Sequence, residues 1–184
     1  VETDIKDQNV DQIVCLGDAI QGGPQPAEVV RRLRQMNCPV VMGNADAWLI
    51  SGEETGDEGI PPERLRKMGE IRLWSLSQLT EDDIDFISKF QPTVSIKLED
   101  RLDLLCFHGS PASFDDVILP AAPEEEFKKF LGAYTGQILT GGHTHAQQMR
   151  RLGDLFFFNP GSVGFAYSHD QPEDQFRAEP WAEY

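Results

Sequence analysis

The sequence predicts a single α/β domain over residues 1–184, and three observations support this prediction. Of the 184 residues, 40% are hydrophobic and 26% charged, which is ordinary for a globular domain with one core. Short apolar runs at 13–16 and 39–42 are rich in strand-forming residues, and a helical pattern at 26–36 separates them. This order of strand, helix and strand is typical of α/β folds.

The apolar pattern in the middle of the chain predicts mostly helical structure. Residues 46–90 show helical spacing of apolar side chains, broken by an acidic, Gly-rich loop at 52–59. Thr80 precedes three acidic residues, so we expect it to cap a helix. At the start of the chain, Val1 and Ile5 lie four residues apart, which favours helix within residues 1–9.

The apolar pattern in the second half of the chain predicts several strands and one helix. Strand-like runs lie at 93–98, 102–107, 137–140, 147–151 and 155–158, and a helical pattern lies at 124–131. The first two runs predict a hairpin, and a tight turn at 152–154 joins the last two. The tail at 168–184 is polar and interrupted by proline, so we expect irregular structure there.

Net charge, cysteine content and hydropathy indicate which partners and which cellular compartment to expect. The net charge of -15 disfavours nucleic acids and anionic membranes. Cys15, Cys38 and Cys106 lie in or beside apolar runs, and their odd number favours free thiols in a reducing compartment. No apolar stretch approaches the ~20 residues of a membrane span, and no signal-peptide pattern opens the sequence. We therefore expect a cytoplasmic protein.

Polar residues of metal-ligand type follow four of the apolar runs. Each of these runs ends close to a glycine, which permits a sharp backbone turn at the end of a strand. These residues are Asp18, Asn44, His108 and the pair His143 and His145. Because the carboxyl ends of strands line the ligand crevice of open α/β sheets, we expect the side chains to converge.

The residue types in this group favour a metal site. His143 and His145 are two positions apart, so both imidazoles can face one site from an extended or turning loop. Oxygen ligands combined with imidazole suit manganese, zinc or iron better than calcium. Taken singly, Asp18 and Asn44 are ordinary turn or cap residues, and His108 is a core histidine. Recurrence at four strand ends favours the metal site over these interpretations.

The order of the motifs resembles that of the calcineurin-like metallophosphoesterases, especially their small bacterial single-domain phosphodiesterases. The resemblance extends over about residues 11–164. It is strongest at Gly17-Asp18, Gly142-His143-Thr144-His145 and Asn159-Pro160-Gly161-Ser162-Val163-Gly164. It implies an α/β sandwich of two sheets flanked by helices, with metals at the ends of the central strands. It also implies hydrolysis of small phosphate esters, phosphodiesters above all, by a metal-activated water.

The resemblance implies a role for each candidate ligand. Asp18 would bridge two cations, and His145 would bind the first of them. Asn44, His108 and His143 would complete the site of the second. The family's first motif, Asp-x-His after the opening strand, would lie upstream of Val1. We therefore expect two divalent ions (Mn, Zn or Fe) in the complete protein, but one ion and little turnover in this chain.

The same resemblance implies a chain whose opening strand is missing and whose C-terminus is also cut short. Val1 in place of methionine fits an excerpt from a longer chain, and it also fits translation from an alternative start codon.

One motif departs from the family pattern and leaves a second function open. Many relatives have a histidine that resembles a general acid where this sequence has Ala45, which favours substrates with good leaving groups. Asp46 is the candidate catalytic residue in this motif. The alternative function is a non-catalytic scaffold, as in a retromer subunit of the superfamily. Ala45 and the missing first motif favour the scaffold, whereas the intact ligand set favours the enzyme.

Overall fold

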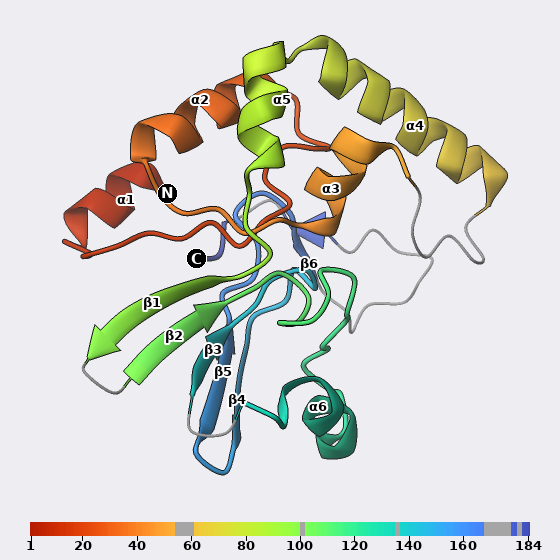
Figure 1. The fold of residues 1–184 in the computed structure, drawn as a ribbon. Helices are drawn as coiled ribbons and strands as arrows, with labels where there is room; N and C mark the ends of the chain where they lie inside the picture. Colours follow the sequence, from red (N-terminus) through yellow and green to blue (C-terminus); the bar gives the residue numbers. More distant parts are fainter. Residues whose placement is uncertain (54–60, 100–101, 135–136, 168–177, 180–181) are drawn as a thin grey trace.

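The computed structural model describes residues 1–53, 61–99, 102–134, 137–167, 178–179 and 182–184. Most helices lie in the first half of the sequence and most strands in the second (Figure 1). The helices are α1 (Glu2–Asp7), α2 (Pro26–Met36), α3 (Asn44–Ser51), α4 (Pro62–Ser77), α5 (Glu81–Ser88) and α6 (Glu124–Leu131). The strands are β1 (Val94–Glu99), β2 (Leu102–Cys106), β3 (Ile138–Thr140), β4 (Gln148–Leu152), β5 (Leu155–Asn159), β6 (Ala166–Tyr167) and β7 (Ala178–Glu179).

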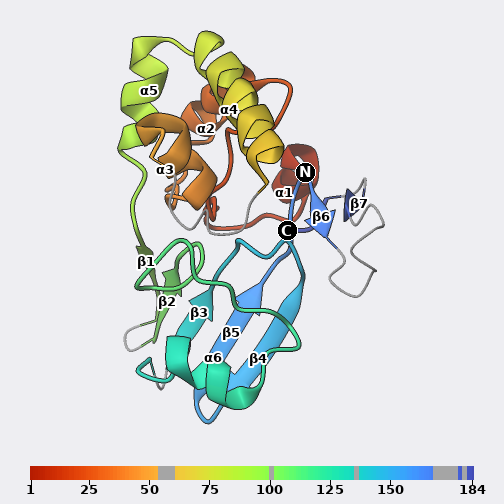
Figure 2. The ribbon, with the colours of Figure 1, turned by 90° about the vertical axis from the view of Figure 1, so that its right-hand side faces the viewer.

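Five strands form one mixed sheet in the order β1-β2-β3-β5-β4. Strands β2, β3 and β5 are parallel, with Cys106 opposite Thr140 and Thr140 opposite Phe158. Strands β1 and β4 pair antiparallel to their neighbours at the two edges. The carboxyl ends of the parallel strands point toward the helices α2 to α5 (Figure 2). Residues that follow these strands are therefore carried to the boundary between sheet and helices.

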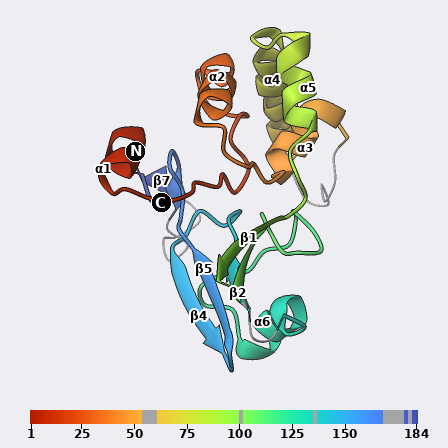
Figure 3. The ribbon, with the colours of Figure 1, turned by 60° about the vertical axis from the view of Figure 1, so that its left-hand side comes forward.

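Helices α2 to α5 form a layer at this end of the sheet (Figure 3). Helix α2 has Pro26 in its first turn and ends at Asn37 in the left-handed conformation, as helix boundaries commonly do. The helices enclose a cluster of buried apolar side chains, which stabilises the layer. The buried members are Ile20, Val30, Leu33, Val40, Leu49, Ile87 and Phe90.

Helix α6 covers one face of the five-stranded sheet (Figure 2). Its first turn carries three glutamates and its last turn two lysines, which suits the helix dipole. Phe127 and Leu131 of α6 belong to the buried cluster that contains Leu139, Leu155 and Phe157 of the sheet. A third, smaller cluster connects the bridged segment at 39–42 to the sheet through Val41, Val94 and Cys106. The segment between α2 and α3 thus meets the sheet through packed apolar side chains.

The α/β class and most predicted elements are confirmed. The helices predicted at 26–36 and 124–131 correspond to α2 and α6, and α1 lies within residues 1–9. The Thr80 side chain caps α5 by accepting a bond from the Asp83 amide. The predicted hairpin is β1 and β2, and the later strand predictions correspond to β3, β4 and β5. Most of the loop predicted at 52–59 lies outside the described residues.

The predictions of strands at 13–16 and 39–42 are wrong in extent. These segments form single parallel bridges, Cys15 with Val40 and Val41 with Gln91. The bond from the Val41 amide to the Cys15 carbonyl is 2.9 Å long. The chain turns at Gly17, where φ is 93°, and α3 begins directly after Gly43. Both segments therefore end before a longer ladder forms. Within the described residues, the second sheet consists of β6 and β7.

The predicted irregular tail is partly described. Residues 168–177 and 180–181 lie outside the described part, whereas β7 pairs antiparallel with β6. The prediction is therefore wrong for residues 178–179. Near the two ends of the chain, the Tyr184 hydroxyl donates to Oδ2 of Asp4 at 2.6 Å, and the termini lie close together (Figure 3). Among the helices of the described ranges, none is long and apolar enough to cross a membrane.

Candidate metal centre

Asp18 lies where two glycine-containing turns meet. Its φ of 53° is left-handed, and it directly follows Gly17. A Cβ on Gly17 would lie 2.7 Å from the Gly43 nitrogen, and a Cβ on Gly43 would lie 2.1 Å from Oδ1 of Asp18. Neither position has room for a side chain. These glycines let Oδ1 of Asp18 accept the Ala45 amide at 2.9 Å, in the first turn of α3.

His108 follows β2 and is almost completely buried, with 2% of its surface exposed. Its Nδ1 lies 2.7 Å from the Leu16 carbonyl oxygen and donates its proton there. This bond fixes the orientation of the ring. The opposite nitrogen, Nε2, then lies 3.2 Å from Oδ2 of Asp18. The segment that ends in Asp18 therefore also orients His108 toward it.

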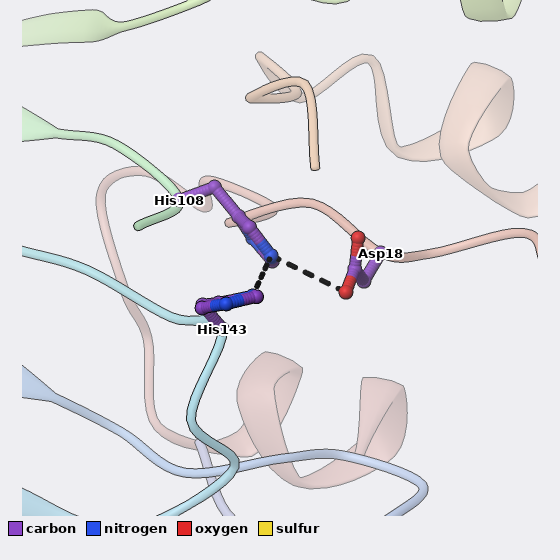
Figure 4. A group of neighbouring side chains, drawn as sticks. All are labelled: Asp18, His108 and His143. Carbon is purple, nitrogen blue, oxygen red and sulfur yellow. Dashed lines mark hydrogen bonds and ion pairs between the residues drawn. The ribbon is translucent and has the colours of Figure 1, made fainter. Parts of the chain in front are cut away.

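Two further side chains approach Nε2 of His108. Oδ1 of Asn44, at the start of α3, lies 3.2 Å away, and Nδ1 of His143, which follows β3, lies 3.2 Å away. Figure 4 shows Asp18, His108 and His143 pointing toward one another from three separate segments. The structure thus brings together four predicted site residues: Asp18, Asn44, His108 and His143.

The backbone around this group is strained. Among the described residues other than glycine, five have φ in the left-handed region, and three of these are Asp18, His143 and His145. Their φ values are 53°, 64° and 55°. This conformation costs an L-residue about 1–2 kcal/mol. Strain at Asp18 and His143, which present polar side chains to one point, is typical of functional sites.

Burial and charge shift the pKa values within the group. Burial raises the pKa of Asp18, but the bond and charge of His108 and the Ala45 amide outweigh it, so the pKa is lowered. Burial lowers the pKa of His108, but the bond and charge of Asp18 outweigh it, so the pKa is raised. Burial and then the charge of His108 lower the pKa of His143 to about 4. His143 is therefore neutral near pH 7 and offers a lone pair, as a metal ligand must.

The donor atoms fit a divalent cation. Because Nδ1 of His108 donates to Leu16, Nε2 of the neutral ring carries a lone pair. Its neighbours are Oδ2 of Asp18 and Oδ1 of Asn44, which are acceptors, and Nδ1 of His143, which offers a lone pair when the ring proton is on Nε2. A proton on Nε2 satisfies one neighbour at a time, whereas a cation satisfies all of them.

The separations agree with this interpretation. Metal–ligand bonds of ~2.1 Å place adjacent ligand atoms about 3.0–3.4 Å apart. The separations to Nε2 of His108 are each 3.2 Å. The ligand atoms of Asp18, His108 and His143 all lie within 4.8 Å of one another. Mixed oxygen and nitrogen ligands of this kind suit manganese, zinc or iron.

His145 is not part of this compact group. Its Nδ1 lies 2.8 Å from the Phe165 carbonyl oxygen, and its ring packs edge-on against the Phe165 ring. Metal-binding histidines typically donate one ring N–H to a carbonyl in this way, which leaves the other nitrogen for the metal. The role of His145 as a ligand of another cation stays a prediction.

Asp46, the predicted catalytic residue, is fully buried next to the turn that follows Asp18. Its exposed fraction is 0%, and its carboxylate accepts backbone bonds from Ala19, Ile20 and Gly43. Burial and then the charge of Asp18 raise its pKa to about 7. The hydrogen bonds that Asp46 accepts thus come from backbone amides of the turns that carry Asp18 and Asn44. Its catalytic role stays a prediction.

Sequence reasoning missed Asn159 as a residue of the site. Its Nδ2 donates to the Gly142 carbonyl at 2.7 Å and to Oγ1 of Thr144 at 3.1 Å, on either side of His143. Its Oδ1 accepts the Gly161 amide at 2.9 Å. The apolar run at 155–158 ends directly in Asn159, but Phe158 and Pro160 flank it, so it lacks the adjacent glycine that marked the other strand-end residues. The motif that begins at Asn159 is the signal that could have found it.

Residues 1–176 match a family model described as the calcineurin-like phosphoesterase superfamily domain. The chain is also 25% identical over 192 residues to the uncharacterised protein MJ0912 of Methanocaldococcus jannaschii. That alignment covers 95% of this chain and 71% of the relative.

Two solved structures are similar in fold. The hypothetical protein PH1004 from Pyrococcus horikoshii has a TM-score of 0.73 at 19% identity, over 89% of this chain and 69% of that one. A metallophosphoesterase from Sphaerobacter thermophilus has a TM-score of 0.67 at 24% identity, over 92% of this chain and 73% of that one. At these identities the similarity shows the fold alone.

Proposed function

This chain belongs to the calcineurin-like phosphoesterase superfamily, and on that premise we propose that it hydrolyses small phosphodiesters with a bound divalent cation. The superfamily comprises metal-dependent hydrolases of phosphate esters, which gives the general reaction class. The observation that carries the proposal is the convergence of oxygen and nitrogen ligand atoms of Asp18, Asn44 and His143 around Nε2 of His108. We assign the cation to Asp18, Asn44, His108 and His143.

The chain's own residues prepare this site before substrate binds. Leu16 keeps the proton of His108 on Nδ1, so that Nε2 presents its lone pair. The Ala45 amide holds Oδ1 of Asp18, so the other carboxylate oxygen faces the histidines. When bound, a divalent cation lowers the pKa of water and neutralises charge on the phosphoryl oxygens. The acidic surface does not prevent binding of an anionic substrate, because the cation dominates the local field.

Ala45 limits the choice of leaving group. It lies next to Asn44 in the first turn of α3, and its methyl group cannot donate a proton. A substrate whose leaving group is stable as an anion does not need this donor. We therefore propose activated diesters, such as aryl phosphodiesters, as the preferred class.

We propose one tightly bound ion rather than two. In the part of the chain that the structure describes, His145 is the residue that we assign to a second cation, and Asp18 would have to share its carboxylate with it. Two protein ligands rarely hold a divalent ion against water. We therefore expect slow turnover with manganese, zinc or iron.

An activity assay on the metal-free and manganese-loaded chain tests this function. We expect Mn²⁺-dependent release of nitrophenolate, faster from bis(para-nitrophenyl) phosphate than from para-nitrophenyl phosphate. Asp18→Asn should abolish it, whereas Asp103→Asn, on the exposed side of β2, should not. Absence of Mn²⁺-dependent hydrolysis, or activity that survives both chelation and Asp18→Asn, would contradict the proposed chemistry. A faster rate with the monoester would contradict the diester assignment.

A further inference from the structure

We infer that Asp46 is a positioning residue that holds the turn containing Asp18 against the start of α3 and thereby sets Asp18 relative to Asn44. The inference rests on the proposed function, because Asp18 and Asn44 are proposed ligands of the same cation. It assigns Asp46 a role at backbone amides instead of at the substrate.

A reciprocal pair of carboxylates joins the two segments. Oδ1 of Asp18 accepts the Ala45 amide of α3 at 2.9 Å. In return, Oδ1 of Asp46, also in α3, accepts the amides of Ala19 at 3.2 Å and Ile20 at 3.3 Å. These are the two residues that follow Asp18. Each carboxylate therefore binds the backbone of the segment that carries the other.

A further bond ties Asp46 to the residue before Asn44. Oδ2 of Asp46 accepts the Gly43 amide at 3.3 Å, which is one half of a capping box at the start of α3, because Gly43 has no side chain to supply the other half. Asn44 lies between Gly43 and Asp46, so this bond restricts the backbone that presents its side chain. One buried carboxylate thus contacts backbone on both sides of the proposed metal site.

Burial explains why this carboxylate acts on the backbone. Asp46 has an exposed fraction of 0%, and a buried carboxylate is tolerated only when hydrogen-bond donors surround it. The donors come from the turn after Asp18 and from the helix start, whereas a capping box needs only the helix start. The bonds to Ala19 and Ile20 are therefore additional to capping, and they are the ones that link the two ligands.

Asp83 provides a matched comparison in the same chain. It occupies the corresponding third position of α5, and its Oδ2 accepts the Thr80 amide at 3.0 Å. It also pairs with Arg34 across 3.5 Å, away from the ligand cluster. Asp83 and Asp46 both cap a helix. Of the two, Asp46 also accepts bonds from the turn after Asp18. Substituting each in turn separates capping from positioning.

The test measures Mn²⁺ affinity by calorimetry in the full chain and in Asp46→Ala and Asp83→Ala, with urea unfolding of each metal-free protein. Alanine removes both carboxylate oxygens, whereas asparagine would keep an oxygen that accepts the Ala19 and Ile20 amides. Loss of a residue that supports a ligand typically lowers affinity about 10–100-fold. We expect this loss for Asp46→Ala and a change below about twofold for Asp83→Ala, although both lower the urea midpoint. Wild-type affinity in Asp46→Ala, or an equal loss in Asp83→Ala, would overturn the inference.

Amide hydrogen exchange of the metal-free wild-type chain gives a second measurement that needs neither a folded variant nor Mn²⁺. We expect the amides of Ala19 and Ile20 to be protected. Exchange at the rate of an unprotected peptide at both amides would overturn the inference, even if Asp46→Ala fails to fold. A wild-type chain that binds no Mn²⁺ would overturn the proposed metal site, and in that case unprotected exchange at both amides would still show separately that Asp46 does not hold the turn.

Discussion

Nε2 of His108 lies 3.2 Å from Oδ2 of Asp18, and the carbonyl of Leu16, two residues before Asp18, orients the histidine through its other nitrogen. One short segment therefore supplies both a carboxylate and the group that directs its partner. Because His108 is buried, this arrangement persists only if the chain around Gly17 keeps its sharp turn. The following predictions test how the surrounding residues maintain and use this site.

Replacing Ala45 by histidine should reduce the dependence of the rate on the leaving group. An imidazole at this position can donate a proton, and general acid catalysis contributes about 10²–10⁴-fold. We expect hydrolysis of an alkyl phosphodiester to rise relative to that of bis(para-nitrophenyl) phosphate. Ala45→Gln is the control, because it fills similar space without an acidic proton of suitable pKa. An unchanged rate ratio in Ala45→His would show that another group protonates the leaving group.

Asn159→Asp should weaken both the fold and the metal site. The change replaces the donor to the Gly142 carbonyl by an oxygen, so the turn around His143 loses that bond and gains a repulsive contact between two oxygens. We expect a loss of about 1–3 kcal/mol in the free energy of unfolding, measured with urea, together with lower Mn²⁺ affinity. Asn37→Asp, at the exposed left-handed end of α2, is the matched control. Equal behaviour of the two variants would contradict the role of Asn159.

His145→Gly should be more stable than His145→Ala. Both variants lose the bond to Phe165, but glycine adopts a φ of 55° without the strain that alanine retains. We expect a difference of about 1 kcal/mol in the free energy of unfolding. In α5, Asp85→Gly should instead be less stable than Asp85→Ala, because glycine is unfavourable inside helices. If alanine is the better residue at both positions, the strain assigned to His145 is wrong.

The thiol of Cys15 should make the free energy of unfolding fall at high pH. Burial raises its pKa to about 12 from the 9.0 of an exposed thiol. Because the folded-state pKa is the higher one, this stability is fully present below pH 9 and is lost as the pH rises toward 12. Between pH 8 and about 10.5, the wild type should lose about 2 kcal/mol more than Cys15→Ala. Parallel urea profiles for the two proteins would contradict this assignment.

The sequence predicted the regular parts of the fold because their signals are local. Helix α2 has apolar spacing and Pro26 at its start, and α5 has Thr80 in a capping box, so neighbouring residues determine both elements. The segments around Cys15 and Val40 have the composition of strands but form single bridges. Their extent depends on the turns at Gly17 and Gly43, where loops from distant positions approach closely.

The candidate site was predictable in its residue types but not in its supporting contacts. Asp18 and His108 follow apolar strand-like runs, and parallel strands bring such ends together. Histidine is enriched in the left-handed region but adopts other conformations far more often, so the residue type alone does not predict the backbone of His143. The bonds from Ala19 to Asp46 and from Asn159 to Gly142 join residues far apart in the chain. They follow from tertiary structure, which local patterns do not determine.

Titration of the metal-free chain with Mn²⁺ in a calorimeter tests the central claim most directly, namely that Asp18, Asn44, His108 and His143 hold one divalent cation. We predict one tightly bound ion per chain. Asp18→Asn should lower the affinity by more than the ~10–100-fold typical of residues that only support a ligand, and Asp103→Asn should leave it unchanged. Absence of Mn²⁺ binding, two tightly bound ions, or wild-type affinity in Asp18→Asn would contradict the account.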